Sequence, residues 1–244
     1  MSDELLFELK KVSKKFTRGK ETISIFEDLN LAIKKGDFVS IMGPSGSGKT
    51  TLLNMLGGVD KPTSGSILFE DHPIENLSES ELAKWRAAHV GFIFQFYNLM
   101  PMLNAEKNVE LPLMLKKLSS AQRKKSVATA LKLVGLGERA KHLPKELSGG
   151  QQQRVAIARA IVSDPDLLFC DEPTGDLDRA TATEILEMLQ LLNKDFGKTI
   201  VMVTHDPEAA KFASTCLHLD KGIFERQDIK GERATITETV ENES

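Results

Sequence analysis

The sequence feature that most constrains the fold is a glycine-rich loop that follows a short apolar run. Residues 38–42 (Phe-Val-Ser-Ile-Met) are typical of a buried strand, and Thr50 to Leu56 are typical of a helix. Between them, residues 43–50 (Gly-Pro-Ser-Gly-Ser-Gly-Lys-Thr) match the pattern G-x-x-x-x-G-K-[ST]. Glycines let the N–H groups of such a loop converge on phosphate oxygens, and the helix start adds a positive partial charge. The pattern therefore predicts a nucleotide phosphate site between a strand and a helix.

Two side chains of this loop have defined chemical tasks in the prediction. Lys49 supplies a positive charge for the β- and γ-phosphates, and the Thr50 hydroxyl can ligate Mg²⁺. We expect the nucleotide, which the resemblance described below implies is ATP, to be held by Gly43, Pro44, Ser45, Gly46, Ser47, Gly48, Lys49, Thr50 and Thr51.

A second apolar run ends in two carboxylates. Residues 167–170 (Leu-Leu-Phe-Cys) predict a buried strand, and Asp171 and Glu172 follow it directly. In an open α/β sheet, ligands bind at the carboxyl ends of the strands. Asp171 is then placed to hold Mg²⁺, and Glu172 to deprotonate an attacking water. The alternative is a plain turn, because Pro173 and Gly175 come next.

The remainder of the chain predicts strands that alternate with helices, which favours an α/β fold with a mainly parallel sheet. Residues 5–16 and 22–33 predict a pair of strands, and Ser78, Ser119 and Ser148 each begin a capping box. Composition is ordinary for a globular protein, with 41% hydrophobic and 27% charged residues. The net charge of −3 gives no general attraction to nucleic acid or anionic lipid. We expect Cys170 and Cys216 to be buried free thiols, and no apolar run is long enough to span a bilayer.

The order of the motifs carries a resemblance to a known family. The phosphate loop, Leu-Ser-Gly-Gly-Gln at 147–151, the pair Asp171–Glu172 and the later His205 together resemble the ATPase cassette of ABC (ATP-binding cassette) transporters. The resemblance implies a P-loop NTPase fold, with a RecA-like α/β core, an antiparallel β lobe and an inserted helical lobe at about 96–150. It implies one domain over 5–228, and we expect the tail 229–244 to be disordered.

The resemblance also implies roles for individual residues. Phe16 would stack on adenine, although a strand-end core position is the alternative for it. Gln95 would touch Mg²⁺, and His205 would contact the γ-phosphate and take part in catalysis. Two cassettes would bind head to tail as a homodimer on ATP binding. The ATP bound by one chain would then be contacted in trans by residues of the other chain, namely Ser148, Gly149, Gly150, Gln151 and Asp178.

Narrower segments look like the bacterial LolD/MacB/FtsE branch of the family. They include residues 62–65, 94–101, 108–113 and 148–160. The resemblance implies an ATPase subunit for export, lipoprotein release or mechanotransmission. It would lie at the cytoplasmic face of the inner membrane, with a permease that has a large extracytoplasmic domain and with no nucleic acid as partner. Five residues after Gln95 form an apolar group, namely Phe96, Tyr97, Leu99, Met100 and Met102. We expect at least half of them to lie in the core, and the others would line a groove that receives the permease.

Two other functions remain possible from the sequence. A soluble ABC-type ATPase would usually carry two cassettes or a long coiled coil, and this chain has one phosphate loop and no heptad array. A P-loop kinase would leave residues 147–151 and His205 unexplained.

Overall fold

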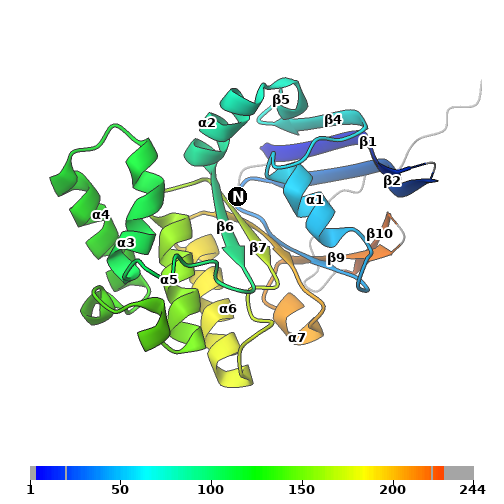
Figure 1. Cartoon of the computed structure of the whole chain (residues 1–244). Coiled ribbons are helices and arrows are strands. Elements are labelled where there is room, and N and C mark those ends of the chain that lie inside the picture. The colour runs from blue at the N-terminus through cyan, green and yellow to red at the C-terminus, as the bar shows by residue number, and fades with distance from the viewer. Residues whose placement is uncertain (1–3, 20, 221, 228–244) are drawn as a thin grey trace, which may run out of the picture.

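A mostly parallel sheet forms the centre of the fold (Figure 1). The computed structural model describes residues 4–19, 21–220 and 222–227. Within these residues the strand order is β10-β9-β3-β8-β7-β6, and only the pairing of β9 with β10 is antiparallel. The strands are β3 (Phe38–Met42), β6 (Val90–Phe94), β7 (Leu167–Asp171), β8 (Thr199–Val203), β9 (Thr215–Asp220) and β10 (Ile223–Gln227).

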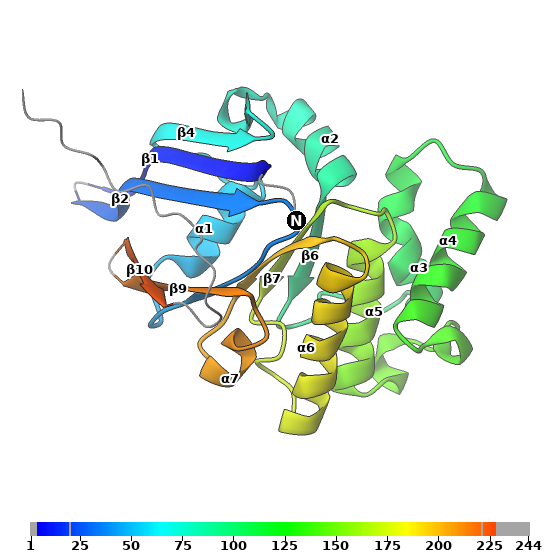
Figure 2. The ribbon, with the colours of Figure 1, turned by 180° about the vertical axis from the view of Figure 1, so that it is seen from behind.

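Both faces of the central sheet are buried, which explains why its strands are apolar without alternation. Along β7, Leu167 and Phe169 belong to one hydrophobic cluster, and Leu168 and Cys170 belong to the other. The first cluster packs under α1 (Lys49–Leu56) and the antiparallel lobe. The second packs under α5 (Gly149–Ile161) and α6 (Arg179–Lys194), on the opposite face (Figure 2).

A smaller antiparallel sheet lies beside α1 and has the strand order β2-β1-β4-β5. The predicted pairing of the first two strands is confirmed, and several bulges interrupt its register. The elements of this lobe and of the segment after it are β1 (Leu5–Arg18), β2 (Glu21–Lys34), β4 (Ser64–Phe69), β5 (His72–Pro73), η1 (Ile74–Asn76) and α2 (Glu79–His89).

The helical segment between β6 and α5 holds short helices, namely α3 (Ala105–Glu110), η2 (Leu111–Leu115), α4 (Ser120–Leu133), η3 (Gly137–Arg139) and η4 (Pro144–Glu146). The capping boxes predicted at Ser78, Ser119 and Ser148 are all present. This agrees with the expected α/β core, antiparallel lobe and inserted helices. The division into one domain over 5–228 stays a prediction, and the tail 229–244 lies outside the described residues.

Sequence reasoning missed strand β6. Val90 to Phe94 pair in parallel with β7 along its whole length, and the sequence analysis assigns no strand there. The short helix α7 (Pro207–Ala210) follows β8. Both cysteines are buried and free, as predicted, and burial raises the pKa of the Cys170 thiol. In the described part of the chain, no helix has the length and apolar character needed to cross a membrane.

Candidate nucleotide-binding and hydrolysis site

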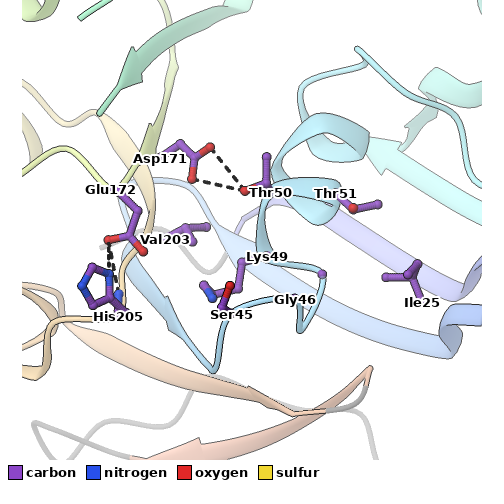
Figure 3. A pocket seen from close by; sticks show the side chains of 11 residues that line it. Ile25, Ser45, Gly46, Lys49, Thr50, Thr51, Asp171, Glu172, Val203 and His205 are labelled. Carbon is purple, nitrogen blue, oxygen red and sulfur yellow. Dashed lines mark hydrogen bonds and ion pairs between the residues drawn. The ribbon is translucent and has the colours of Figure 1, made fainter. Parts of the chain in front are cut away.

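The phosphate loop and the carboxyl ends of β7 and β8 surround one open cavity of about 540 Å³ (Figure 3). Parallel strands bring their carboxyl ends to the same edge of the sheet, so the motifs at 43–51 and 171–172 and His205 meet there. The cavity is lined by Ile25, Ser45, Gly46, Gly48, Lys49, Thr50, Thr51, Asp171, Glu172, Val203 and His205.

At two positions of the loop, neighbouring atoms lie so close to the backbone that only glycine fits. A Cβ at Gly43 would lie 2.2 Å from the carbonyl oxygen of Leu219. Gly48 has φ +98°, and a Cβ there would lie 2.7 Å from both Ile25 Cγ2 and Phe26 Cζ. Gly48 is also the N-cap of α1, and it makes no side-chain cap hydrogen bond. The first N–H groups of α1 are therefore left for a bound anion.

The loop holds polar groups that suit an anionic ligand. Lys49 is almost buried, and its Nζ donates to the carbonyl oxygens of Gly43 at 2.8 Å and Pro44 at 2.9 Å. The buried hydroxyl of Ser47 has no hydrogen-bond partner among the described residues. A buried polar atom without a partner is costly, and a phosphate oxygen would supply the missing acceptor. The loop thus fits the predicted phosphate ligand.

Thr50 and Asp171 face each other across the cavity and offer oxygen donors. The Thr50 hydroxyl lies 3.5 Å and 3.4 Å from the two carboxylate oxygens of Asp171. Burial raises the pKa of Asp171, with the neighbouring charge of Glu172 acting in the same direction, whereas the Thr50 hydroxyl lowers it. The described residues contain no group of three His, Cys, Asp or Glu side chains able to hold a metal by themselves. A hard cation between Thr50 and Asp171 would therefore share its coordination with phosphate and water, which is the usual environment of Mg²⁺.

Glu172 and His205 form the second polar pair of the cavity. Glu172 Oε2 lies 2.9 Å from His205 Nδ1, and it accepts a hydrogen bond from the backbone N–H of His205 at 3.3 Å. The backbone of Glu172 has φ +48°, in the left-handed region that only few non-glycine residues adopt. Strained backbone of this kind is concentrated at functional sites. The turn holds the carboxylate over the cavity, where a water could approach it.

Other predicted site residues do not line this cavity. The ring of Phe16 is 45% exposed on the antiparallel lobe. Gln95 rests against Gly175, where a Cβ would lie 3.0 Å from Gln95 Nε2. Asp178 is the N-cap of α6, and its carboxylate accepts from the N–H of Thr181 at 3.0 Å and from its hydroxyl at 2.6 Å. These hydrogen bonds lower the pKa of Asp178.

The start of α5 also lies away from the cavity. Ser148 caps the helix by accepting from the N–H of Gln151 at 3.3 Å, and Gln151 Oε1 accepts from the N–H of Ser148 at 3.0 Å. The sequence interpretation attributed the two glycines between them to the approach of a phosphate. The structure gives each glycine a reason within this chain. A Cβ at Gly149 would lie 2.9 Å from the Tyr97 hydroxyl, and one at Gly150 would lie 2.3 Å from Thr181 Cγ2.

Helix α5 fastens the loops that follow Gln95 and Glu172 to each other. The buried side chain of Gln153 donates to the carbonyl oxygen of Pro173 at 2.6 Å and to that of Phe94 at 3.3 Å. Arg159 donates to the carbonyl oxygens of Tyr97 at 2.8 Å and Asn98 at 2.6 Å. Three segments that are distant in sequence therefore share one hydrogen-bonded framework.

Tyr97 adds a side-chain contact to this framework. Its hydroxyl hydrogen-bonds Asp176, and burial together with the charge of Asp176 raises the pKa of Tyr97. Both Tyr97 and Asn98 have positive φ angles, of 56° and 49°. The loop after Gln95 is thus held in a strained backbone conformation by contacts with α5 and with the loop that leads to Asp178.

A second cavity, of about 280 Å³, opens between β6, η2 and the end of α5. Asn98, Leu115 and Arg159 are among its lining residues. The expectation that at least half of the apolar residues after Gln95 are core is wrong, because Phe96, Met100 and Met102 are exposed. Of the five residues considered, only Leu99 packs against a hydrophobic cluster.

Sequence reasoning missed two lining residues of the nucleotide cavity. Ile25 and Val203 lie in predicted strands, but an apolar residue in a strand gives no signal that it faces a ligand. Val203 ends β8, so the rule that ligands bind at strand ends could have suggested it. No comparable signal exists for Ile25, which reaches the cavity from the antiparallel lobe.

Comparisons with known proteins show the family of this chain. The family model described as "ABC transporter" matches residues 26–175. The chain is 47% identical over 227 residues to the ABC transporter ATP-binding protein MJ0796 of Methanocaldococcus jannaschii, covering 91% of this chain and 97% of the relative. It is 44% identical over 222 residues to the lipoprotein-releasing system ATP-binding protein LolD of Acinetobacter baylyi, covering 91% of this chain and 97% of LolD.

A solved structure gives the same result for the fold. The dimeric MJ0796 cassette in a post-hydrolysis state, bound to ADP and Pi, matches with a TM-score of 0.85 and 44% identity. The match covers 93% of this chain and 100% of that chain. The likeness to LolD agrees with the branch that the sequence motifs indicated. The chain belongs to the ABC transporter ATP-binding family.

Proposed function

We propose that this chain binds ATP with residues 43–51, hydrolyses it with Glu172 and thereby drives a separate membrane permease. One observation carries the proposal. Lys49, Thr50, Asp171, Glu172 and His205 come from distant parts of the chain and line one cavity. The relative MJ0796 is a dimer bound to ADP and Pi in a post-hydrolysis state. The proposal assigns the steps to particular residues.

ATP binding begins with the phosphates. Lys49 places its ammonium at the phosphate loop, and the first N–H groups of α1 point into the same space. Ser45, Gly46 and Thr51 line the cavity around them. We assign the adenine to the exposed ring of Phe16, because a half-exposed aromatic ring on this lobe offers a stacking surface.

Mg²⁺ would be held by the Thr50 hydroxyl and Asp171, with Gln95 as a further oxygen donor. The bound cation would neutralise charge on the phosphates. The long separation of 3.4–3.5 Å between Thr50 and Asp171 suits two groups that share a third partner better than it suits one strong hydrogen bond. This donor set contains only oxygen, which is the type that Mg²⁺ prefers.

Hydrolysis requires a base for the attacking water, and we assign this role to Glu172. Its carboxylate accepts a proton as the water oxygen bonds to the γ-phosphorus, and the bond from that phosphorus to the ADP oxygen breaks. His205 holds the carboxylate at 2.9 Å and lines the same cavity. We assign to His205 the γ-phosphate contact as well.

The remaining predicted residues would serve the ATP of a second copy. Ser148, Gly149, Gly150, Gln151 and Asp178 do not line the cavity of their own chain. Ser148 and Asp178 are exposed at two helix starts, α5 and α6. A cavity as open as this one leaves room for a second chain to close it. In the solved structure of the relative MJ0796, the cassette is a dimer.

The permease would dock at the cavity between β6, η2 and α5. Leu115, which lines this cavity, is 78% exposed, and the loop after Gln95 exposes Phe96 at 70% and Met102 at 90%. An exposed apolar patch of this kind marks an interaction site. The related LolD belongs to a lipoprotein-releasing system. We therefore propose export, lipoprotein release or mechanotransmission at the cytoplasmic face of the inner membrane, with a permease that has a large extracytoplasmic domain.

The test of the hydrolysis site is Glu172→Gln, which keeps the size of the side chain and removes its basicity. General-base catalysis contributes about 10²–10⁴-fold, so the turnover number for ATP should fall by that factor. The Kd for ATP should change little, because Lys49, Thr50 and Asp171 are unaltered. Glu187→Gln, at an exposed position of α6, is the matched control. Wild-type turnover in Glu172→Gln would remove this residue from the mechanism.

A further inference from the structure

Lys14 on strand β1 is a buried lysine with three partners. Its side chain is part of a residue that is only 7% exposed, which is rare for lysine. Its Nζ donates to Asp60 Oδ1 at 2.6 Å and to the carbonyl oxygen of Lys61 at 2.8 Å. The same Nζ lies over the ring of Phe16, 4.8 Å from its centroid. The ammonium is therefore fixed on one side by the turn after α1 and covers the aromatic ring on the other.

The position of Lys14 relates it to the nucleotide cavity. Lys14 lies opposite Phe26 in the register of β1 and β2. The ring of Phe26 meets the phosphate loop, because a Cβ at Gly48 would lie 2.7 Å from Phe26 Cζ. Asp60 and Lys61 follow the end of α1, the helix that begins at Lys49. Lys14 thus connects Phe16 to strand β2 and to the turn after helix α1, the two elements that border the phosphate site.

A half-exposed aromatic ring needs something to hold its orientation. Phe16 is 45% exposed, so the hydrophobic core gives it little support. An ammonium within about 6 Å of a ring centroid attracts the ring face, and the attraction is stronger where the cation is desolvated. Lys14 meets both conditions. It covers one face of the ring and leaves the remaining surface to a ligand.

We infer that Lys14 is a positioning residue for the nucleotide base, because it holds the ring of Phe16 in the orientation that stacks on adenine. The inference rests on the proposed role of Phe16. Asp60 and the Lys61 carbonyl keep the ammonium in place. Lys14 does not line the nucleotide cavity, so we expect its effect on binding to pass through the ring alone.

A purely structural salt bridge would behave differently. If Lys14 only fastened β1 to the turn at 60–61, its loss would loosen the lobe and weaken every ligand of the cavity alike. A residue that acts through the ring affects ATP, which has a base, and does not affect inorganic tripolyphosphate, which has none. Comparison of the two ligands separates the two roles.

The experiment measures the Kd of the full chain for Mg-ATP and for tripolyphosphate by titration calorimetry. Lys14→Met keeps most of the length of the side chain and removes the charge. We expect its Kd for ATP to rise about 3- to 10-fold, the range that corresponds to one partly buried cation–π contact, with the Kd for tripolyphosphate unchanged. Its KM for ATP should rise in the same way, with kcat unchanged. Lys14→Arg, which keeps a cation, should restore the affinity for ATP.

Two further variants complete the design. Lys10→Met removes an exposed lysine of the same strand that pairs with Glu8, and it should change neither Kd. Asp60→Asn keeps the ammonium but weakens its anchor, so it should raise the Kd for ATP by less than Lys14→Met does. Asp60→Asn also provides a test if Lys14→Met does not fold.

The outcomes distinguish this inference from the proposal on which it rests. If Phe16→Ala leaves the Kd for ATP unchanged, the assignment of Phe16 fails. If Phe16→Ala weakens ATP binding and neither Lys14→Met nor Asp60→Asn does, the inference about Lys14 fails alone. Equal losses for ATP and tripolyphosphate in Lys14→Met would also overturn it. In the Phe16→Ala background, Lys14→Met should add no further loss.

Discussion

Glu172 Oε2 and His205 Nδ1 lie 2.9 Å apart at the ends of neighbouring strands β7 and β8. The pairing follows from the topology, because the N–H of Glu172 also donates to the carbonyl oxygen of Val203 at 2.9 Å and so extends the ladder by one residue. Beyond that bond the chain turns with φ +48° at Glu172. The carboxylate is therefore held by its own strained backbone and by the imidazole across from it.

Removal of the imidazole should impair hydrolysis more than binding. In His205→Ala the carboxylate of Glu172 loses the partner that orients it, and the proposed γ-phosphate contact is lost as well. Loss of one preorganised donor typically costs about 10²- to 10³-fold in kcat, and we expect a fall in this range. The Kd for ATP should change less than tenfold. Steady-state ATPase assays and calorimetry measure the two quantities, with His72→Ala, an exposed histidine next to β4, as control. Normal turnover in His205→Ala would show that the pair has no catalytic part.

Loss of the loop cation should impair ATP binding as well as hydrolysis. Lys49→Ala removes a charged donor, and hydrogen bonds to charged groups contribute about 1.5–3 kcal/mol. We expect ATP to bind at least about 10-fold more weakly, with turnover abolished and the far-UV circular dichroism spectrum unchanged. Lys84→Ala, at an exposed position of α2, is the control. Wild-type hydrolysis by Lys49→Ala would contradict the assignment of this loop.

The start of α5 can be tested in a chain that cannot hydrolyse ATP. A ligand that binds the dimer better than the monomer shifts the equilibrium to the dimer. Glu172→Gln should therefore elute as a monomer without nucleotide and as a dimer with Mg-ATP in size-exclusion chromatography. The added change Ser148→Arg puts bulk and charge at the helix start and should return the chain to the monomer.

Loss of the helix cap alone must be separated from this effect, because it costs about 1 kcal/mol of stability. Ser119 supplies the matched control. It caps α4 by the same S-x-x-Q box, accepting from the N–H of Gln122 at 3.2 Å. Ser119→Arg in the Glu172→Gln background should still dimerise with Mg-ATP. If Glu172→Gln binds ATP and stays monomeric at high concentration, the chain does not form the head-to-tail dimer without its permease.

Most residues that line the candidate nucleotide cavity were predictable from sequence because they lie in local motifs. The loop 43–50 directly follows strand β3 and leads into helix α1, so strand, turn and helix start are adjacent in sequence. Asp171 and Glu172 likewise lie at the end of their own strand. The strand rule then brings these stretches to one edge of the sheet. Strand β6 was missed for the opposite reason. Its apolar run continues without a turn signal into the exposed residues from Phe96 onwards, so the sequence marks no boundary at Phe94.

Contacts between elements were not predictable. The approach of Thr181 to Gly150 depends on how α6 packs against α5, and the bond of Tyr97 to Asp176 depends on how two loops meet. Neither leaves a spacing pattern in the sequence. The sequence alone therefore suggested only a bound ligand as the reason for the glycines at 149 and 150.

Charged substitutions of the exposed apolar residues after Gln95 should abolish binding of the permease and leave the fold intact. Phe96→Glu should abolish copurification with the permease, because a charge at the proposed apolar contact is costly to bury. Basal ATPase activity should remain, since Phe96 is 70% exposed and does not line the nucleotide cavity. Phe196→Glu, at an exposed phenylalanine after α6, is the matched control and should copurify normally. Retention of the permease by Phe96→Glu together with Met102→Glu would exclude this surface as the docking site.

The last prediction concerns the close contact between α5 and α6. Alanine is the better residue inside a helix, by about 1 kcal/mol, so Gly150→Ala would stabilise an isolated α5. Here its Cβ would lie 2.3 Å from Thr181 Cγ2. Thr181 cannot rotate away freely, because it is β-branched and its hydroxyl bonds Asp178 at 2.6 Å. We expect the clash to dominate and Gly150→Ala to lower the free energy of unfolding by about 1–3 kcal/mol, measured by urea denaturation.

Thr181→Ser should reverse this loss, because it deletes the methyl group and keeps the hydroxyl on Asp178. Gly137→Ala is the matched control, since nothing lies within 4 Å of a Cβ at Gly137, and it should leave stability unchanged within about 0.5 kcal/mol. The double variant Gly150→Ala, Thr181→Ser is then tested for dimerisation in the Glu172→Gln background. If it regains stability and also forms the ATP-bound dimer there, packing against Thr181 is the whole reason for the glycine. If it regains stability and stays monomeric with Mg-ATP in that background, Gly150 is also needed for the approach of the second chain's ATP. A Gly150→Ala chain as stable as the wild type would show that α5 and α6 can separate enough to admit a methyl group.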